Sequence, residues 1–405
     1  MNKSDQLIQA RLETTLARYV AMPTVTADVA ACQQAIQTLA GELAALGMAT
    51  YTGNSRHPWL IATANPRAQQ TKHVKILFVI HFDVVAPAHK DHFMVKTTAD
   101  KLYGRGVIDM KFAAAACYEV FKDLAADDTL SAYDAGVLIT TDEEAGGKDG
   151  AGDFLQQGWR CDLAIVPDGG RNWSVEARAK GVNYIYVVAN GLSAHSSRPW
   201  EGQSPLQRFS KGMQEIDLHF KNDDPQGLVV AINTIESTNA GIVNSTQTPG
   251  WIKAGISMRA FNTAELETGM EFIKSVAKKY DLQIVPSLND SPVHIMRENP
   301  LVEAFIKTLT EVRGKQTEFT DALGASDARH FARQNIPTVL VYPEGGELHG
   351  EGEWLKRTDL LTYYKLIQHY LRHVAFNADG LSLGSAKRFT KYRTVFAKMV
   401  GLKAK

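Results

Sequence analysis

The sequence has few cysteines, and their spacing argues against two kinds of site. Cys32, Cys117 and Cys161 are the only three cysteines in 405 residues, and no two of them form a Cys-x-x-Cys pair. This pattern argues against a disulfide framework and against a thiolate metal site. It is typical of reduced, packed thiols in a cytosolic protein.

Long apolar runs, an apolar leader and an excess of one charge are also missing. No apolar run approaches the roughly 20 residues that a membrane-spanning helix needs. The first residues, Met1 to Gln6, lack the apolar core of a secretory signal. The formal net charge is +0, which argues against a nucleic-acid or membrane surface for the whole chain. We therefore expect a cytoplasmic protein with neither nucleic acid nor membrane as a partner.

The chain is long enough for two domains, and its first part alternates helices with strands. Hydrophobic residues make up 44% and charged residues 22%, as in soluble globular proteins. Residues 5–21 have the three-four apolar spacing of an amphipathic helix, and a second helix is expected over 27–46. Strands are expected at 48–52, 58–64, 76–80, 135–141 and 162–166, with a helix ending near residue 124. This alternation predicts an α/β domain with a mostly parallel sheet.

The pattern changes near residue 178 and returns after residue 295. Strands are expected at 182–188, 228–238, 251–261 and 282–287, with helices at 204–220 and 263–280. The order β-α-β-β-α-β predicts an inserted ferredoxin-like α+β domain. A helix at 299–313, a buried strand at 338–343 and a helix at 358–375 then complete the first domain.

We therefore predict three parts. A discontinuous catalytic domain comprises residues 1–177 and 296–377, and the inserted domain comprises 178–295. Residues 378–405 form a basic tail, which we interpret as a solvated terminus. The alternative is a tether to an acidic partner, for which binding would weaken with salt and disappear on truncation at Asn377.

Residues with metal-binding side chains follow the strand ends of the first domain. His81 comes directly after the apolar run from Ile76 to Ile80. In open α/β sheets, ligands gather beyond the carboxyl ends of the strands. Later strand and loop ends along the chain supply Asp109, Glu143, Glu144, Asp168 and His349.

Two imidazoles and four carboxylates suit a pair of divalent ions. Without thiolates, the set favours zinc, with cobalt or manganese as alternatives. Two ions about 3.5–4 Å apart need a bridging ligand, and Asp109 is best placed for it. Of the adjacent Glu143 and Glu144, one can bind a metal while the other takes a proton from water. The pattern of residues alone leaves open which does which.

Five segments, taken in order, resemble the M20 family of metallopeptidases and deacylases over residues 5–375. They begin at His81-Phe-Asp83, Gly104-Arg-Gly-Val-Ile-Asp109, Thr141-Asp-Glu-Glu144, Asp168-Gly-Gly and His349. The family includes dipeptidases, aminoacylases, acetylornithine deacetylase and succinyl-diaminopimelate desuccinylase. The resemblance implies that one ion binds His81 and Asp168, the other binds Glu144 and His349, and Asp109 bridges them.

The resemblance also implies roles around the metals. Glu143 would be the general base, and Asp83 would orient His81. The peptide bond between Asp109 and Met110 would be cis. The inserted domain would be a lid through which two copies form a homodimer, and His195 would reach the partner subunit's active site to steady the oxyanion.

Residues implied to bind the substrate complete the prediction. In the lid, Asn244 and Arg259 resemble contacts to a substrate carboxylate, for which an arginine fork is well suited. Arg259 could equally be a surface residue of its strand. Ser326 and Arg329 resemble residues that line the pocket.

The predicted activity is hydrolysis of an amide or peptide bond in a small molecule with a free carboxylate. A dipeptidase or peptidase competes with an N-acyl-amino-acid deacylase. Asp168 favours the peptidase, because the desuccinylases mostly have Glu there. A third reading, an inactive metal-binding scaffold, would require the loss of a ligand or of the base, and neither is lost.

Overall fold

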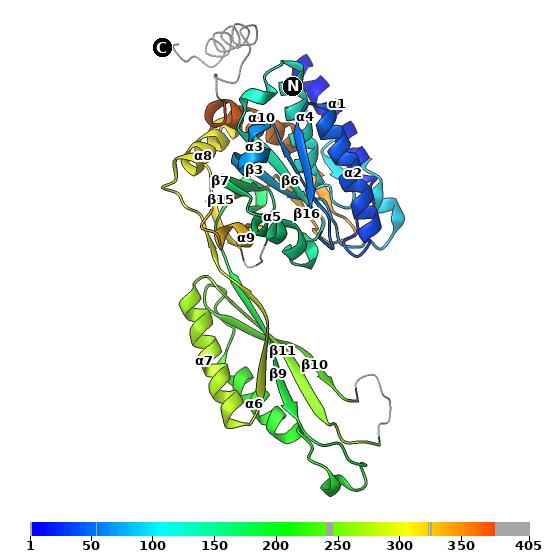
Figure 1. Ribbon diagram of the computed structural model, residues 1–405, viewed down its shortest axis with the longest axis vertical. Helices are drawn as coiled ribbons and strands as arrows, with labels where there is room; N and C mark the ends of the chain where they lie inside the picture. Colours follow the sequence, from blue (N-terminus) through cyan, green and yellow to red (C-terminus); the bar gives the residue numbers. More distant parts are fainter. Residues whose placement is uncertain (1, 54, 240–245, 323, 325, 377–405) are drawn as a thin grey trace. The chain divides into compact units, whose positions relative to one another are not determined.

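The structure is a computed structural model that describes the chain except residues 1, 54, 240–245, 323, 325 and 377–405. The predicted basic tail, 378–405, therefore lies outside the described residues. The chain forms two compact units (Figure 1). The first takes its described residues from Met1–Ala177, Ile295–Thr320 and Ser326–Lys405, and the second from Arg178–His294 and Asp321–Ala325.

The first unit is built around a six-stranded sheet. Its strands are β1 (Ala49–Gly53), β2 (Trp59–Thr63), β3 (His73–His81), β6 (Ala135–Thr140), β7 (Arg160–Val166) and β15 (Thr338–Leu340). Their order is β1-β2-β6-β3-β7-β15. Strands β6, β3, β7 and β15 run parallel to one another. At one edge of the sheet, β2 pairs antiparallel with β6, and β1 pairs antiparallel with β2. The central strands are almost wholly buried, which explains their continuous apolar runs.

Five long helices pack on this sheet and on one another. They are α1 (Lys3–Val20), α2 (Val29–Ala45), α4 (Lys111–Ala126), α8 (Pro300–Arg313) and α10 (Arg357–Val374). Helix α4 contacts α1, α10 and β3, and its run Ala113–Ala116 is buried. These small side chains let the helix lie close to its neighbours. Helix α2 is capped by Asp28, whose side chain accepts a hydrogen bond from the backbone N–H of Ala31.

Shorter elements complete the first unit. A four-stranded sheet has the order β16-β17-β5-β4. The bounds are α3 (Arg67–Thr71), β4 (Lys96–Thr97), β5 (Lys101–Tyr103), α5 (Asp153–Gln156), α9 (Ala328–Ala332), β16 (Gly345–Gly346) and β17 (Trp354–Lys356). Single helical turns are η1 (Lys90–Phe93), η2 (Leu130–Ala132), η3 (Glu143–Ala145), η4 (Lys148–Gly152) and η5 (Arg171–Trp173).

The second unit has a four-stranded antiparallel sheet with two helices on one face. Its elements are β9 (Gly181–Asn190), η6 (Pro199–Glu201), α6 (Leu206–His219), β10 (Val229–Ser237), β11 (Trp251–Ala260), α7 (Thr263–Lys279) and β12 (Gln283–Asp290). The sheet order is β10-β11-β9-β12. Alternate residues of β9 and β11 join residues of α6 and α7 in one apolar core. The α/β class and the β-α-β-β-α-β order are both those expected from the sequence.

The boundary between the units and one strand differ from the sequence prediction. A three-stranded sheet, β13-β8-β14, contains β8 (Val175–Ala179), β13 (Val293–His294) and β14 (Phe319–Ala322). The segment Asp321–Ala325, which the sequence assigns to the first domain, belongs to the second unit, where Arg178 Nε donates to Asp321 Oδ1 at 3.1 Å. Strand β15 ends at Leu340 because its partner β7 ends at Val166, before Pro167.

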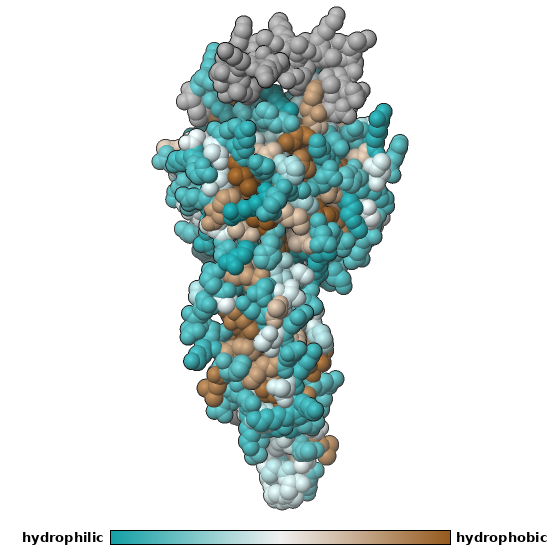
Figure 2. All heavy atoms as spheres, turned by 90° about the vertical axis from the view of Figure 1, so that its left-hand side faces the viewer, coloured by the Kyte–Doolittle hydropathy of each residue, from teal (hydrophilic) through white to brown (hydrophobic). Residues whose placement is uncertain are grey.

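The surface visible in Figure 2 is largely hydrophilic, with apolar side chains in scattered patches. Among the described residues, no helix combines the length and apolar character needed to cross a bilayer.

Candidate metal centre

His81 is the last residue of β3 and is 2% exposed. Its Nδ1 lies 3.0 Å from the main-chain oxygen of Asp83 and 3.5 Å from the Asp83 Oδ1. Its Nε2 lies 2.9 Å from Asp109 Oδ1. The imidazole is therefore held at one nitrogen and points the other into the centre.

The Asp83 carboxylate makes a second set of contacts. It accepts hydrogen bonds from the hydroxyl of Thr26 at 2.9 Å and from the backbone N–H groups of Glu143 and Glu144, both at 3.3 Å. Asp83 thus links the end of β3 to the turn η3 that follows β6. Its main-chain oxygen, rather than its side chain, is nearest to the His81 nitrogen.

Asp109 lies between two imidazoles. Its Oδ2 is 3.0 Å from His349 Nε2, while its Oδ1 faces His81. His349 Nε2 is also 3.1 Å from Glu144 Oε1. The peptide bond between Asp109 and Met110 is cis, as the family resemblance implies. One carboxylate oxygen directed at each imidazole is the arrangement that a shared ligand requires.

Two groups of possible ligands result. His81, Glu143 and Asp168 offer ligand atoms within 4.8 Å of one another. Asp109, Glu144 and His349 form a second group by the same measure. The structure thus brings together all five predicted metal ligands and the predicted base.

The crowded carboxylates have altered pKa values. Burial is the main cause that raises the pKa of Glu143 to about 8, against the opposing charge of His81. Burial also raises the pKa of Glu144. For Asp168, burial raises the pKa well above its ordinary value, and the charges of Glu143 and Asp109 add to it. Burial and neighbouring carboxylates thus disfavour the charged form of each of these acids, and bound cations would offset that effect.

Asp109 and the two imidazoles shift one another's pKa values in opposite directions. Burial would raise the pKa of Asp109, but hydrogen bonds with His349 and His81 hold it below its usual range. The hydrogen bond with Asp109 raises the pKa of His349. For His81, burial lowers the pKa, and the hydrogen bonds with Asp109 and Asp83 overcome it and raise the value. A proton or a divalent cation can satisfy each of these nitrogens, so the donor set fits a metal pair.

The segment 326–330 packs beneath the turn that carries Glu143. Thr140 donates to Asp327 at 3.1 Å, and a Cβ at Gly147 would lie 1.9 Å from Asp327 Oδ1. His330 Nε2 lies 3.1 Å from the Gly146 oxygen. The predicted pocket residues Ser326 and Arg329 are each 7% exposed, and the charge of Arg329 lowers the pKa of Glu143.

Three predicted residues belong to the second unit. His195 lies in the exposed loop after β9, where its Nδ1 is 2.8 Å from Ser197 Oγ. Arg259 lies in β11, opposite Val182 and Val229. Asn244 lies outside the described residues.

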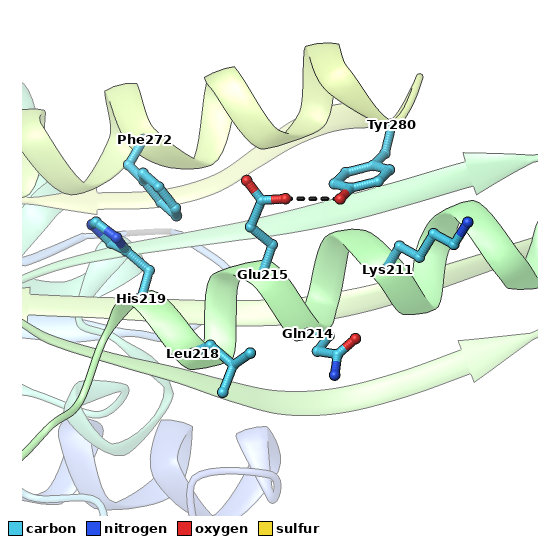
Figure 3. A pocket seen from close by; sticks show the side chains of 7 residues that line it. All are labelled: Lys211, Gln214, Glu215, Leu218, His219, Phe272 and Tyr280. Atoms are coloured by element: carbon cyan, nitrogen blue, oxygen red, sulfur yellow. Dashed lines mark hydrogen bonds between the residues drawn. The ribbon is translucent and has the colours of Figure 1, made fainter.

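An open groove in the second unit contains none of the predicted residues. Figure 3 shows its lining from α6, from α7 and from Tyr280 directly after α7; the Tyr280 hydroxyl donates to Glu215 at 2.8 Å. The ring of His219 stacks on Phe272 with centroids 3.5 Å apart. The groove gathers a single carboxylate and no cluster of metal-binding groups, so its chemistry is unlike that of the candidate centre. Its lining is Lys211, Gln214, Glu215, Leu218, His219, Phe272 and Tyr280.

Sequence reasoning missed two charged residues at the centre. Arg105 stands inside the Gly-Arg-Gly segment but received no role, although a charge between two glycines is a usable signal. Glu353 follows His349 by four positions and carries no local signal. Both are buried. Glu353 accepts the backbone N–H of Asp109, and Arg105 pairs with Glu353.

Residues 77–373 match the model of peptidase family M20/M25/M40. The succinyl-diaminopimelate desuccinylase of Rickettsia felis is 26% identical over 321 residues, covering 74% of this chain and 83% of that protein.

Two solved structures share the fold. The aminopeptidase PepT of Bacillus cereus matches with a TM-score of 0.71 and 18% identity, covering 90% of this chain and 98% of that one. An M20 family metallo-carboxypeptidase of Sulfolobus solfataricus matches with a TM-score of 0.71 and 17% identity, covering 92% and 99%.

Proposed function

This chain belongs to peptidase family M20/M25/M40, and we propose that it is a two-zinc peptidase acting on dipeptides or similarly small peptides. Membership of this family makes it a metal-dependent hydrolase of amide or peptide bonds in small molecules. The observation that carries the proposal is the position of Asp109 between His81 and His349, with one carboxylate oxygen directed at each.

We assign the ligands from the two groups. His81 and Asp168 would hold one ion, Glu144 and His349 the other, and Asp109 both. Bound there, the ions would supply a Lewis acid that polarises the scissile carbonyl and lowers the pKa of water. The absence of thiolate and the two imidazoles support zinc, with cobalt or manganese as substitutes.

Glu143 is assigned as the general base. It lies among the ligands, and its pKa of about 8 in the metal-free protein shows how strongly its surroundings favour a bound proton. In the proposed reaction Glu143 takes a proton from the attacking water as the water oxygen bonds to the amide carbon. The carbon–nitrogen bond then breaks, and Glu143 gives that proton to the leaving amine, so that a carboxylic acid and an amine are released.

The remaining roles come from the second unit and from Ser326 and Arg329 of the first. His195 would donate to the developing oxyanion in the partner subunit's site, and Arg259, Asn244, Ser326 and Arg329 would contact the substrate. A homodimer through the second unit is supported by exposed apolar side chains near His195. Leu192 is 60% exposed and Trp200 is 76% exposed, and the segments that carry them are joined through Leu192 and Gln203.

A deacylase of N-acyl amino acids is the second candidate. The likeness to the succinyl-diaminopimelate desuccinylase of Rickettsia felis favours it, while Asp168 favours the peptidase. A panel of dipeptides, N-acetyl and N-succinyl amino acids tests the two, with zinc, cobalt or manganese added and metal content measured on the same sample. Faster turnover of dipeptides supports the peptidase, and faster release of succinate or acetate supports the deacylase. No turnover by a protein that holds two ions would refute both.

Subunit complementation tests the role of His195. Glu143→Gln and His195→Ala homodimers, each inactive, are mixed and allowed to exchange subunits. A hybrid dimer contains one site with both side chains intact, so activity should return to as much as half that of the wild type per hybrid. No recovery in a sample shown to contain hybrids would refute a histidine that acts across the dimer.

A further inference from the structure

A buried ion pair lies behind two of the ligand segments. Arg105 Nη1 donates to Glu353 Oε2 at 2.7 Å, and the two side chains are 3% and 2% exposed. The pair spans 248 positions of the chain. Neither side chain belongs to the two ligand groups.

The Glu353 carboxylate holds the loop that ends at Asp109. Its Oε2 accepts the backbone N–H of Gly106 at 3.0 Å. Its Oε1 accepts the backbone N–H of Ile108 at 3.1 Å and that of Asp109 at 3.3 Å. One carboxylate therefore fixes the backbone of the shared ligand.

The second amino group of Arg105 holds the segment of His349. Arg105 Nη2 donates to the main-chain oxygens of His349 at 3.1 Å and Gly350 at 2.9 Å. His349 has a φ of 61°, a left-handed conformation that is uncommon for residues other than glycine. The guanidinium thus reaches the His349 backbone with one nitrogen and Glu353 with another.

Stability alone is a poor explanation for this pair. Removing two charges from water is costly, and their mutual attraction often does no more than offset that cost. What the pair supplies is a fixed spacing between two segments that are remote in sequence. His81 and Asp168, in contrast, are delivered by the ends of β3 and β7, which pair directly within the main sheet.

We infer that Arg105 and Glu353 are positioning residues that set the distance between Asp109 and His349. They thereby set the affinity for the second ion, which is the one held by Glu144 and His349. The inference rests on the proposed two-metal function. Because Arg105 contacts the backbone of His349, its loss acts on the ion held by Glu144 and His349. Glu353 also fixes Asp109, so its loss should lower the affinity for that ion strongly and the affinity for the ion of His81 and Asp168 weakly.

The test is zinc titration of the full-length, metal-stripped protein against a competing chelator. Arg105→Lys keeps the charge but replaces the two guanidinium nitrogens, one on Glu353 and one on the two carbonyls, with a single nitrogen. Glu353→Gln keeps the shape but turns a donor group toward backbone N–H groups. We expect each substitution to lower the affinity for the second zinc ion by 10-fold to 100-fold, the range found when partners of metal ligands are removed. With Arg105→Lys, the affinity for the first ion, held by His81 and Asp168, should change by less than about threefold.

Matched controls separate positioning from stability. Arg11→Lys cuts a two-point contact with Asp123, in which both distances are 2.8 Å. Glu13→Gln cuts a contact with Arg357 at 2.6 and 3.0 Å. Both controls should lower the melting temperature in chelator yet leave both zinc affinities unchanged. Excess zinc should restore kcat in Arg105→Lys, which a purely structural loss would not allow.

The outcomes are distinct. If Arg105→Lys and Glu353→Gln bind two zinc ions as tightly as the wild type, or no more weakly than Arg11→Lys and Glu13→Gln do, the positioning role is wrong and the two-metal proposal stands. If one variant does not fold, the other decides the matter. A wild-type chain that binds fewer than two ions refutes the two-metal function, and this inference with it.

Discussion

In protein from which divalent ions have been removed, the free energy of unfolding should fall as the pH rises from about 5 to about 7. In the metal-free fold, burial raises the pKa of Glu143 from 4.5 to about 8. A carboxyl with a raised folded-state pKa stabilises fully below its unfolded pKa, and that stability is lost as the pH rises through the folded value. The pKa values of Asp168, His81 and His349 are also raised, so these groups act in the same direction.

The size of the effect follows from Glu143. One pKa unit is worth about 1.4 kcal/mol, so two pH units inside its window cost on the order of 3 kcal/mol. In a chain of this length that corresponds to a fall of roughly 3 to 4 °C in melting temperature. Bound cations replace the protons, so the zinc-loaded protein should lose much less over the same range.

The assay is calorimetry at a series of pH values on chelated and zinc-loaded protein. Glu143→Gln serves as the matched variant, because it removes the titrating group and keeps its shape. Its chelated form should show a clearly smaller slope than the chelated wild type. Stability of the chelated wild type that is constant or rises with pH, or a slope that Glu143→Gln leaves unchanged, would refute the reasoning.

Other substitutions test single parts of the centre. Glu143→Gln should lower kcat by about 10²–10⁴-fold while metal analysis still finds two ions, since it removes the base and no ligand; a change below tenfold would count against this role. Asp109→Asn should lower the affinity for both ions in a zinc titration, because one of its oxygens faces each imidazole. Loss of one ion alone would contradict a bridging role. Gly147→Ala should destabilise the fold by about 2 kcal/mol more than Gly158→Ala in urea denaturation. Both glycines have positive φ, but only the first would drive a Cβ to 1.9 Å from Asp327 Oδ1, so equal losses would refute the predicted clash.

Much of the centre could be predicted because parallel strands deliver their ends to one edge. His81 is the last residue of β3, Glu143 and Glu144 follow β6, and Asp168 follows β7. These three strands are neighbours in the sheet. An apolar run with a polar end is a local signal, so this part of the site is readable from the sequence. The fold class followed from the same alternation of strands and helices.

Contacts between remote segments could not be predicted. Glu353 meets the Asp109 backbone across 244 positions, and no local pattern announces it. The short length of β15 depends on where its partner β7 ends, and the transfer of Asp321–Ala325 to the second unit depends on contacts such as Arg178 with Asp321. Asp83 was expected to orient His81, and its Oδ1 lies 3.5 Å from His81 Nδ1. The hydrogen bonds that its carboxylate also accepts from the backbone of Glu143 and Glu144 had no signal in the sequence.

Anomalous diffraction at the zinc edge, from crystals grown with zinc, tests the two-metal centre most directly. The account predicts two peaks in each chain, one contacted by His81 and Asp168, the other by Glu144 and His349, with Asp109 touching both. A single peak, or peaks that leave Asp109 without a contact to both ions, would contradict it.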